Sequence, residues 1–193
     1  YLFSQFLSPL FNRRTDRWGG SPENRRRFHL EVIRRVRQAV GPDFSLLMKY
    51  GVMDDREGGL PLSEGVATAR EMVKAGIDAI EISAGVGPAV QPLKSGEHER
   101  SFFRERAAAV KRAVSVPVML VGGIRSLALS KEIINSGDAD MISMSRPFIR
   151  EPELIARWQK SEQTAALCIS CSKCLGPSGA FICQEELRLQ QSA

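Results

Sequence analysis

The sequence predicts an α/β fold with a parallel sheet covered by helices, because short apolar stretches alternate with amphipathic ones along its 193 residues. After a first helix, four strand-helix units follow, each of roughly 30 to 40 residues. No Gly-x-Gly-x-x-Gly follows any of the strands, so a dinucleotide-binding domain has little support. Half of a (β/α)8 barrel fits better, since a complete barrel needs about 250 residues.

The N-terminal part predicts a short apolar segment, a polar loop and the first long helix. Pro9 ends any helix in the first ten residues, and a polar loop follows over residues 12–20. Ser21 suits a helix N-cap and Pro22 the first helical turn. Gly41, followed by a proline, ends this helix after about Val40.

The four predicted strands differ from the intervening helices by their short, apolar, β-branched character. They are expected at residues 44–50, 79–83, 116–121 and 139–144. The helices are expected at residues 62–76, about 97–114, 127–136 and from Pro152 onward. A half barrel leaves the outer edges of its first and last strands unpaired, so we expect a missing N-terminal half or a homo-oligomer to complete it.

Composition excludes two classes of partner. No apolar run approaches the roughly 18 residues that span a membrane. The net charge is +5, but many basic residues, in runs 25–27 and 34–37, occupy the polar positions of a helix, and no aromatic residues interleave with them. We therefore expect a solvated basic face, no nucleic-acid or membrane partner, and a cytoplasmic protein.

The chain opens on Tyr1 without an initiator Met, so we expect a fragment.

Two predicted strands end in residues that suit a phosphate group. Gly122 and Gly123 follow one strand, and Ser145 and Arg146 follow the next. Amides without crowding side chains approach an anion closely, a following helix adds positive potential, and a guanidinium binds two phosphate oxygens. Pro147 suits the first turn of the short extra helix found at barrel phosphate sites. The alternative is two ordinary strand-to-helix turns.

Three stretches resemble the old yellow enzyme family of FMN-dependent NAD(P)H:flavin oxidoreductases. They are the segment YLFSQFLSP at 1–9, NRRTDRWGGSPENR at 12–25, and the pair VGGIR at 121–125 with SRPF at 145–148. The resemblance implies the C-terminal half of a TIM barrel, with strands 5 to 8 and their helices. It divides the chain into an FMN-binding half barrel over residues 1–165 and a Cys-rich tail over residues 166–193.

The resemblance also implies roles for single residues. Tyr1 matches the tyrosine that protonates the substrate α-carbon, a task that suits a phenol because it keeps its proton at neutral pH yet can give it to a developing enolate. Lys49 matches a cation beside the flavin N1/O2 edge, whereas a lysine reaching solvent is the alternative. The FMN phosphate binders of the family match Gly122, Gly123, Ser145 and Arg146, although the family more often has Gly at the position of Ser145. The family's substrate-binding histidine pair would precede Tyr1.

Other polar residues receive structural interpretations. Arg14, Asp16 and Arg25 are expected to form a buried ion-pair network that holds the loop at 12–24. His29 and His98 have no second histidine at metal-binding spacing, so both are expected to be structural or solvated.

The tail carries all four cysteines, Cys168, Cys171, Cys174 and Cys183, at C-x2-C-x2-C-x8-C spacing. Four thiolates can enclose a [4Fe-4S] cluster or a zinc ion, and reduced unliganded thiols are the alternative. The segment resembles the cluster segment of the trimethylamine dehydrogenase and 2,4-dienoyl-CoA reductase branch. That branch has three residues between its second and third cysteines and a longer final gap.

Three functions follow as hypotheses. The first is part of an ene-reductase type of NAD(P)H oxidoreductase, in which FMN reduces an activated alkene such as an enone and Tyr1 supplies a proton. The second is a truncated, non-catalytic half barrel that binds only FMN or phosphate. The third is a redox module whose iron-sulfur centre passes electrons to a flavin.

Overall fold

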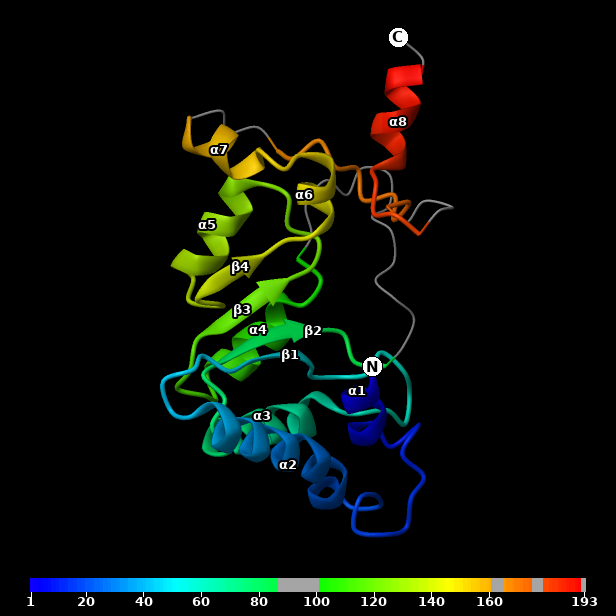
Figure 1. The fold of residues 1–193 in the computed structure, drawn as a ribbon, viewed down its shortest axis with the longest axis vertical. Coiled ribbons are helices and arrows are strands. Elements are labelled where there is room, and N and C mark those ends of the chain that lie inside the picture. Colours follow the sequence, from blue (N-terminus) through cyan, green and yellow to red (C-terminus); the bar gives the residue numbers. More distant parts are fainter. Residues whose placement is uncertain (87–100, 161–164, 175–178, 192–193) are drawn as a thin grey trace.

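The computed structural model describes residues 1–86, 101–160, 165–174 and 179–191. Its centre is a four-stranded sheet in the order β1-β2-β3-β4, in which every neighbouring pair is parallel (Figure 1). The strands are β1 (Leu47–Gly51), β2 (Ala79–Ser83), β3 (Val118–Val121) and β4 (Met141–Ser143). This arrangement confirms the predicted α/β class and the half-barrel strand order.

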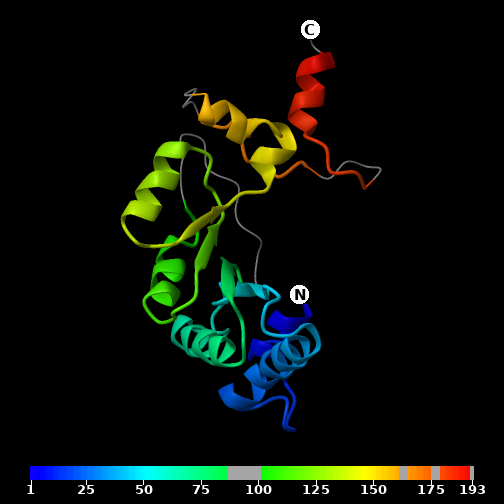
Figure 2. The same ribbon diagram turned by 60° about the vertical axis from the view of Figure 1, so that its left-hand side comes forward.

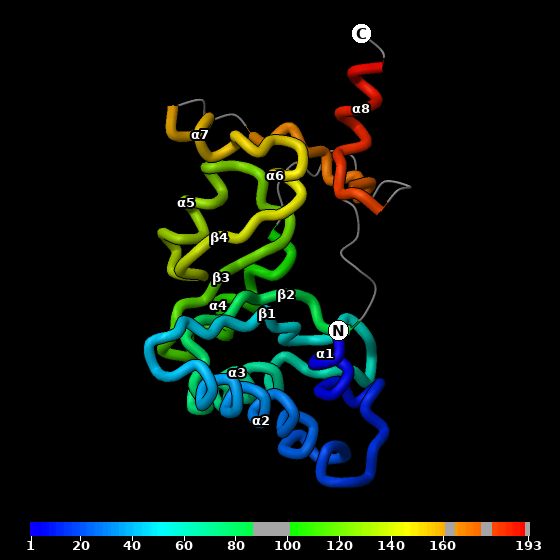
Figure 3. Tube along the Cα trace, viewed as in Figure 1, coloured from blue at the N-terminus to red at the C-terminus, as the bar shows by residue number. Residues whose placement is uncertain are grey.

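Helices connect and cover these strands. They are α1 (Leu2–Leu7), α2 (Pro22–Val40), α3 (Leu62–Lys74), α4 (Arg104–Lys111), α5 (Leu127–Asn135), α6 (Arg146–Arg150), α7 (Leu154–Gln159) and α8 (Gln184–Gln191). In Figure 2 α3, α4 and α5 lie along one side of the sheet, as crossover helices of parallel strands do. The trace in Figure 3 shows α8 projecting away from the strands at the C-terminal end of the chain.

The two faces of the sheet have different environments. Tyr50, Ile82 and Leu120 lie in one row of neighbouring strands and are buried under the helices. The next row, on the opposite face, contains Lys49 and Glu81, followed by Met119 and Met141. Residues on this face are more exposed, and they correspond to the interior positions of a closed barrel.

Most element boundaries agree with those predicted from capping signals. The Ser21 hydroxyl accepts a hydrogen bond from the Asn24 amide, and Gly41 ends α2 with φ 81°. The first strand begins later than predicted, at Leu47, because its partner β2 begins at Ala79 and the preceding Leu46 amide bonds the Asp78 carboxylate instead. The short α6 with Pro147 in its first turn is confirmed, whereas α8 was not predicted.

The packing of α3 against the end of β1 depends on a glycine. A Cβ on Gly65 would lie 1.7 Å from the carbonyl oxygen of Val52, so no larger residue fits without moving the backbone. The close approach also allows the buried Tyr50 hydroxyl to donate to the Gly65 carbonyl oxygen at 2.9 Å. This contact sets the spacing between the helix layer and the sheet.

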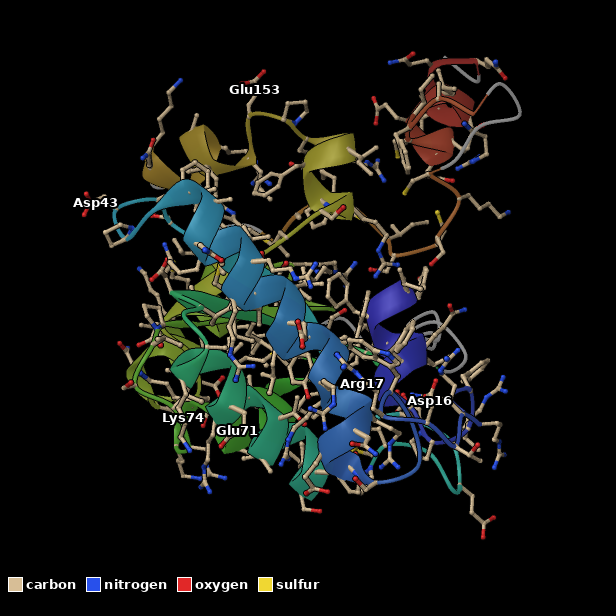
Figure 4. All side chains as sticks on the ribbon, turned by 60° about the horizontal axis from the view of Figure 1, so that its bottom comes forward. Asp16, Arg17, Asp43, Glu71, Lys74 and Glu153 are labelled. Carbon is tan, nitrogen blue, oxygen red and sulfur yellow. The ribbon has the colours of Figure 1, made fainter. Side chains whose placement is uncertain are left out.

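The basic face of α2 is only partly solvated. Arg34 and Arg35 are exposed, as predicted. Figure 4 shows charged residues at the surface of the neighbouring α3 as well, where Lys74 Nζ lies 2.7 Å from Glu71 Oε1. Arg37, by contrast, folds over the helix end and donates to the carbonyl oxygen of Gly76 at 2.8 Å. Charge on this face therefore contributes to the junction with β2 as well as to solubility.

Candidate functional site

The ends of β3 and β4 bring the predicted phosphate-binding residues together. Gly122 and Gly123 have φ of 109° and 79°, values that residues with a side chain rarely adopt. A Cβ on Gly122 would lie 3.0 Å from the Phe103 ring, so a side chain at this position would also crowd that ring. The glycines therefore allow a tight backbone turn at the strand end.

A pocket of about 60 Å³ lies between these strand ends. Its lining joins both halves of the predicted motif and one residue of the Cys-rich tail; it comprises Val121, Gly122, Gly123, Ile124, Arg125, Ser143, Met144, Ser145, Arg146, Pro147 and Ser170. Because α6 has only five residues, its helix dipole adds less than the sequence suggested. Backbone amides and the Arg146 guanidinium are the groups that suit an anion here.

The tail contacts this pocket through hydrogen bonds that sequence reasoning missed. Arg125 Nη1 donates to the carbonyl oxygen of Cys168, and Arg146 Nη1 donates to Ser172 Oγ at 2.9 Å. The Ala166 amide donates to the Arg125 carbonyl oxygen at 2.7 Å. No local pattern could have found these contacts, since each joins positions more than twenty residues apart.

Lys49 lies on the less covered face of the sheet and has an acidic partner. Its Nζ is 2.9 Å from Glu81 Oε1, and the lysine side chain is 54% exposed. Glu81 was not predicted as a site residue, but it is an acid between Ile80 and Ile82, and that interruption of an apolar strand is a usable signal. The pair places opposite charges side by side on adjacent strands.

Tyr1 is 96% exposed. Figures 1 and 3 place the N-terminus on the side of the sheet where the strands have their carboxyl ends, the side on which ligands bind in barrels. No contact of the Tyr1 side chain with Lys49 or with the pocket is found among the described residues.

The predicted buried network of Arg14, Asp16 and Arg25 is wrong. Arg14 and Asp16 do pair, but their side chains are 53% and 45% exposed. Arg25 instead pairs with Glu64 of α3, while its Nη1 donates to the carbonyl oxygen of Gly20 at the end of the loop. The loop is held by the buried Asn12, whose amide donates to the carbonyl oxygens of Phe6 at 2.6 Å and Trp18 at 2.7 Å.

His29 is structural and not solvated. It lies between Phe3 and Tyr50, with ring centroids 5.1 and 6.2 Å away, and its buried Nδ1 has no hydrogen-bond partner in the part of the chain that the structure describes. Burial lowers the pKa of His29 to about 4, so the imidazole is neutral near pH 7. His98 lies outside the described residues.

The four cysteines are free thiols gathered in one part of the tail. Burial, followed by the charges of Cys168, Cys171 and Cys183, raises the pKa of the Cys174 thiol, so the other three cysteines lie near Cys174. Among the described residues, however, no three or more His, Cys, Asp or Glu side chains are arranged to hold a metal ion. The donor set has the chemistry of a metal centre without its formed geometry.

Within the described ranges, none of the helices has both the length and the apolar character needed to cross a membrane.

Comparisons with known proteins identify relatives of this chain. A model of the NADH:flavin oxidoreductase / NADH oxidase family matches residues 1–165. An NADH oxidase of Thermoanaerobacter brockii is 36% identical over 179 residues, covering 91% of this chain and 28% of the relative. A multifunctional alkene reductase/demethylase OYE of Caballeronia cordobensis is 33% identical over 181 residues, covering 90% of this chain and 26% of the relative.

Solved structures show the same relationship. A 2-naphthoyl-CoA reductase in complex with 2-naphthoyl-CoA matches with a TM-score of 0.79 and 28% identity, over 90% of this chain and 27% of that one. The chain therefore spans less than a third of the length of these three proteins. The family match over residues 1–165 and the parallel half barrel lead to one conclusion: the chain belongs to the NADH:flavin oxidoreductase / NADH oxidase family, as its resemblance to old yellow enzyme predicted.

Proposed function

We propose that this chain is the FMN-binding half of an NAD(P)H oxidoreductase of the ene-reductase type. The observation that carries the proposal is the pocket at the ends of β3 and β4, formed by Gly122, Gly123, Ser145 and Arg146 in a chain of this family. Its relatives include an NADPH dehydrogenase of Geobacillus and the alkene reductase named above. The substrate class that follows is an activated alkene such as an enone.

The pocket residues fit the phosphate group of FMN. The pocket volume of about 60 Å³ is several times the roughly 10–15 Å³ that one water molecule requires, so a tetrahedral anion has room. Both glycines leave their backbone free of side chains, and a bidentate guanidinium matches phosphate geometry. Arg146 supplies the positive charge that a phosphate needs.

The remaining roles lie on the less covered face and at the N-terminus. When bound, FMN supplies hydride transfer between NAD(P)H and the alkene. Lys49 stabilises negative charge on the reduced flavin. Glu81, whose Oε1 lies 2.9 Å from Lys49 Nζ, partly offsets the positive charge of the lysine. Tyr1, as a phenol, donates the proton that the substrate α-carbon requires.

A complete barrel needs further strands. In the described part of the chain, β1 and β4 are each paired on one side only. Leu47 of β1 and Met141 of β4 expose apolar surface. Unpaired parallel edges and an uncovered interior face favour covering by more protein. The N-terminal half of the same barrel is the partner we propose, with a second copy of this chain as the alternative.

Arg146→Met tests the cofactor assignment. Loss of a charge-assisted hydrogen bond costs about 1.5–3 kcal/mol, so FMN affinity is expected to fall roughly 10- to 150-fold. Titration of FMN into the protein, followed by flavin fluorescence, measures this. Riboflavin lacks the phosphate, so its affinity is expected to stay unchanged.

Arg34→Met, which removes an exposed charge on α2, is the matched control and should leave FMN affinity within twofold. Equal losses for FMN and riboflavin would show that Arg146 does not contact the phosphate. Wild-type protein that is colourless, cannot be reconstituted with FMN and does not oxidise NADPH with an enone would leave a non-catalytic half barrel as the better interpretation.

We also propose that the tail binds a [4Fe-4S] cluster through Cys168, Cys171, Cys174 and Cys183, with zinc as the alternative. The support is the donor set itself, four free thiols of which three lie near enough to Cys174 to influence it. Anaerobically purified protein is expected to contain about four iron and four sulfide per chain and to absorb visible light. Iron-free protein with one equivalent of zinc would contradict the cluster and favour a tetrahedral zinc site.

A further inference from the structure

The segment Cys168–Ser172 contributes Ser170 to the lining of the pocket at the ends of β3 and β4. Ser170 is part of the pocket lining although it lies 24 residues beyond Arg146 in the chain. It is 4% exposed, so this part of the tail is packed onto the barrel and is not a free extension. The pocket thus has three walls, two from strand ends and one from the tail.

The backbone of this segment has an uncommon form. Ser170 and Ser172 have φ of 55° and 61°, in the left-handed region that residues with a side chain seldom occupy. The Ser170 amide also points at a cysteine, with its nitrogen 3.5 Å from Cys168 Sγ. Such a conformation persists only where surrounding contacts hold it.

Two arginines of the pocket lining provide those contacts. Arg125 donates to the Cys168 carbonyl oxygen, a buried hydrogen bond, and Arg146 donates through Nη1 to Ser172 Oγ at 2.9 Å. A guanidinium has five N–H donors, so a bond to Ser172 leaves others for an anion. Ser172 therefore restrains the side chain that we assign to the phosphate.

We propose that Cys168–Ser172 is the third wall of the phosphate site, and that Ser172 is a positioning residue that holds Arg146 ready for the phosphate. The proposal rests on the proposed function, because the phosphate is that of FMN. Restraining a side chain before binding reduces the entropy lost on binding. By thermodynamic reciprocity, an anion that engages Arg146 also stabilises the closed cysteine segment.

The first test is Ser172→Ala in the full 193-residue chain. FMN affinity is expected to fall roughly three- to tenfold, the effect of one lost hydrogen bond, with riboflavin affinity unchanged. Ser172→Asn is expected to restore affinity, because asparagine tolerates left-handed backbone and offers an oxygen acceptor. A merely structural role for Ser172 would weaken both flavins together and would not be rescued in this selective way.

The second test measures the cysteines directly in reduced, metal-free wild-type chain. Inorganic phosphate is expected to slow the reaction of the thiols with a disulfide reagent such as dithionitrobenzoate at least threefold relative to chloride at equal ionic strength. Ser172→Ala is expected to abolish this protection. Because the wild-type measurement needs no variant, it decides the matter even where a variant fails to fold.

The outcomes separate the two proposals. FMN binding without phosphate protection of the thiols, and with Ser172→Ala as tight as wild type, would overturn the third wall and leave the proposed function standing. Phosphate protection in a chain that binds no FMN would support the wall as an anion site and overturn the FMN assignment. Absence of both FMN binding and protection would overturn both.

Discussion

Glu64→Ala is expected to lower the free energy of unfolding by roughly 3–5 kcal/mol, because it leaves a buried guanidinium without its carboxylate. Arg25 Nη2 lies 2.7 Å from both Glu64 carboxylate oxygens, and the two side chains are only 9% and 13% exposed. The same guanidinium donates to the carbonyl oxygens of Leu7, at 3.0 Å from Nε, and Gly20. One ion pair thus joins α1, the N-terminal loop, α2 and α3.

Urea denaturation at pH 7 measures the effect. Arg14→Ala removes an ion pair of similar geometry at an exposed position and is expected to cost at most about 1 kcal/mol. Glu64→Gln keeps one oxygen acceptor for Arg25 while removing the charge, so its cost should lie between the two. A cost for Glu64→Ala no greater than that for Arg14→Ala would show that the pair does not hold these elements together.

Acidification is expected to destabilise the fold through His29. Its pKa is about 4 in the folded chain and near 6.5 in an unfolded one, so the unfolded state binds the proton more readily. The stability is therefore full above pH 6.5 and is lost as the pH falls towards 4. The loss reaches roughly 3 kcal/mol, since each unit of pKa difference corresponds to about 1.4 kcal/mol.

His29→Phe isolates this contribution, because the phenyl ring suits the aromatic contacts with Phe3 and Tyr50 and cannot take up a proton. Unfolding free energies of the two proteins are compared at pH 7.5, 6, 5 and 4.5. The difference between variant and wild type is expected to shift in favour of the variant as the pH falls. A difference that stays constant over this range would show that His29 takes up its proton equally well in both states.

Much of the fold could be predicted from local patterns. Ser21, Pro22 and Gly41 mark the ends of α2 because capping and backbone preference act within a few residues. The apolar residues of β2 and β3 mark those strands because strand preference also depends on residues close together in the chain. The glycine pair and Ser145-Arg146 were recognisable as one site because parallel strands in sequence order place their carboxyl ends at one edge.

Side-chain partners distant in sequence could not be predicted in this way. Arg25 was expected to join Arg14 and Asp16 in one ion-pair network, but its partner is Glu64, 39 residues later. His29 was expected to be either structural or solvated, and only the packing of α1 and β1 against it decided its burial and neutral state.

The sequence by itself determined the order of strands and helices, the family, and the glycine pair and Ser145-Arg146 that line the pocket at the ends of β3 and β4. Tertiary structure alone decided that the cysteine segment contacts that pocket, through Ser170 in its lining and the hydrogen bonds from Arg125 to Cys168 and from Arg146 to Ser172. The physical reason is the distance along the chain over which each kind of interaction acts. Helix caps, strand patterns and turns depend on neighbours along the chain, whereas a guanidinium selects whichever carbonyl or hydroxyl the packed elements bring within hydrogen-bonding distance.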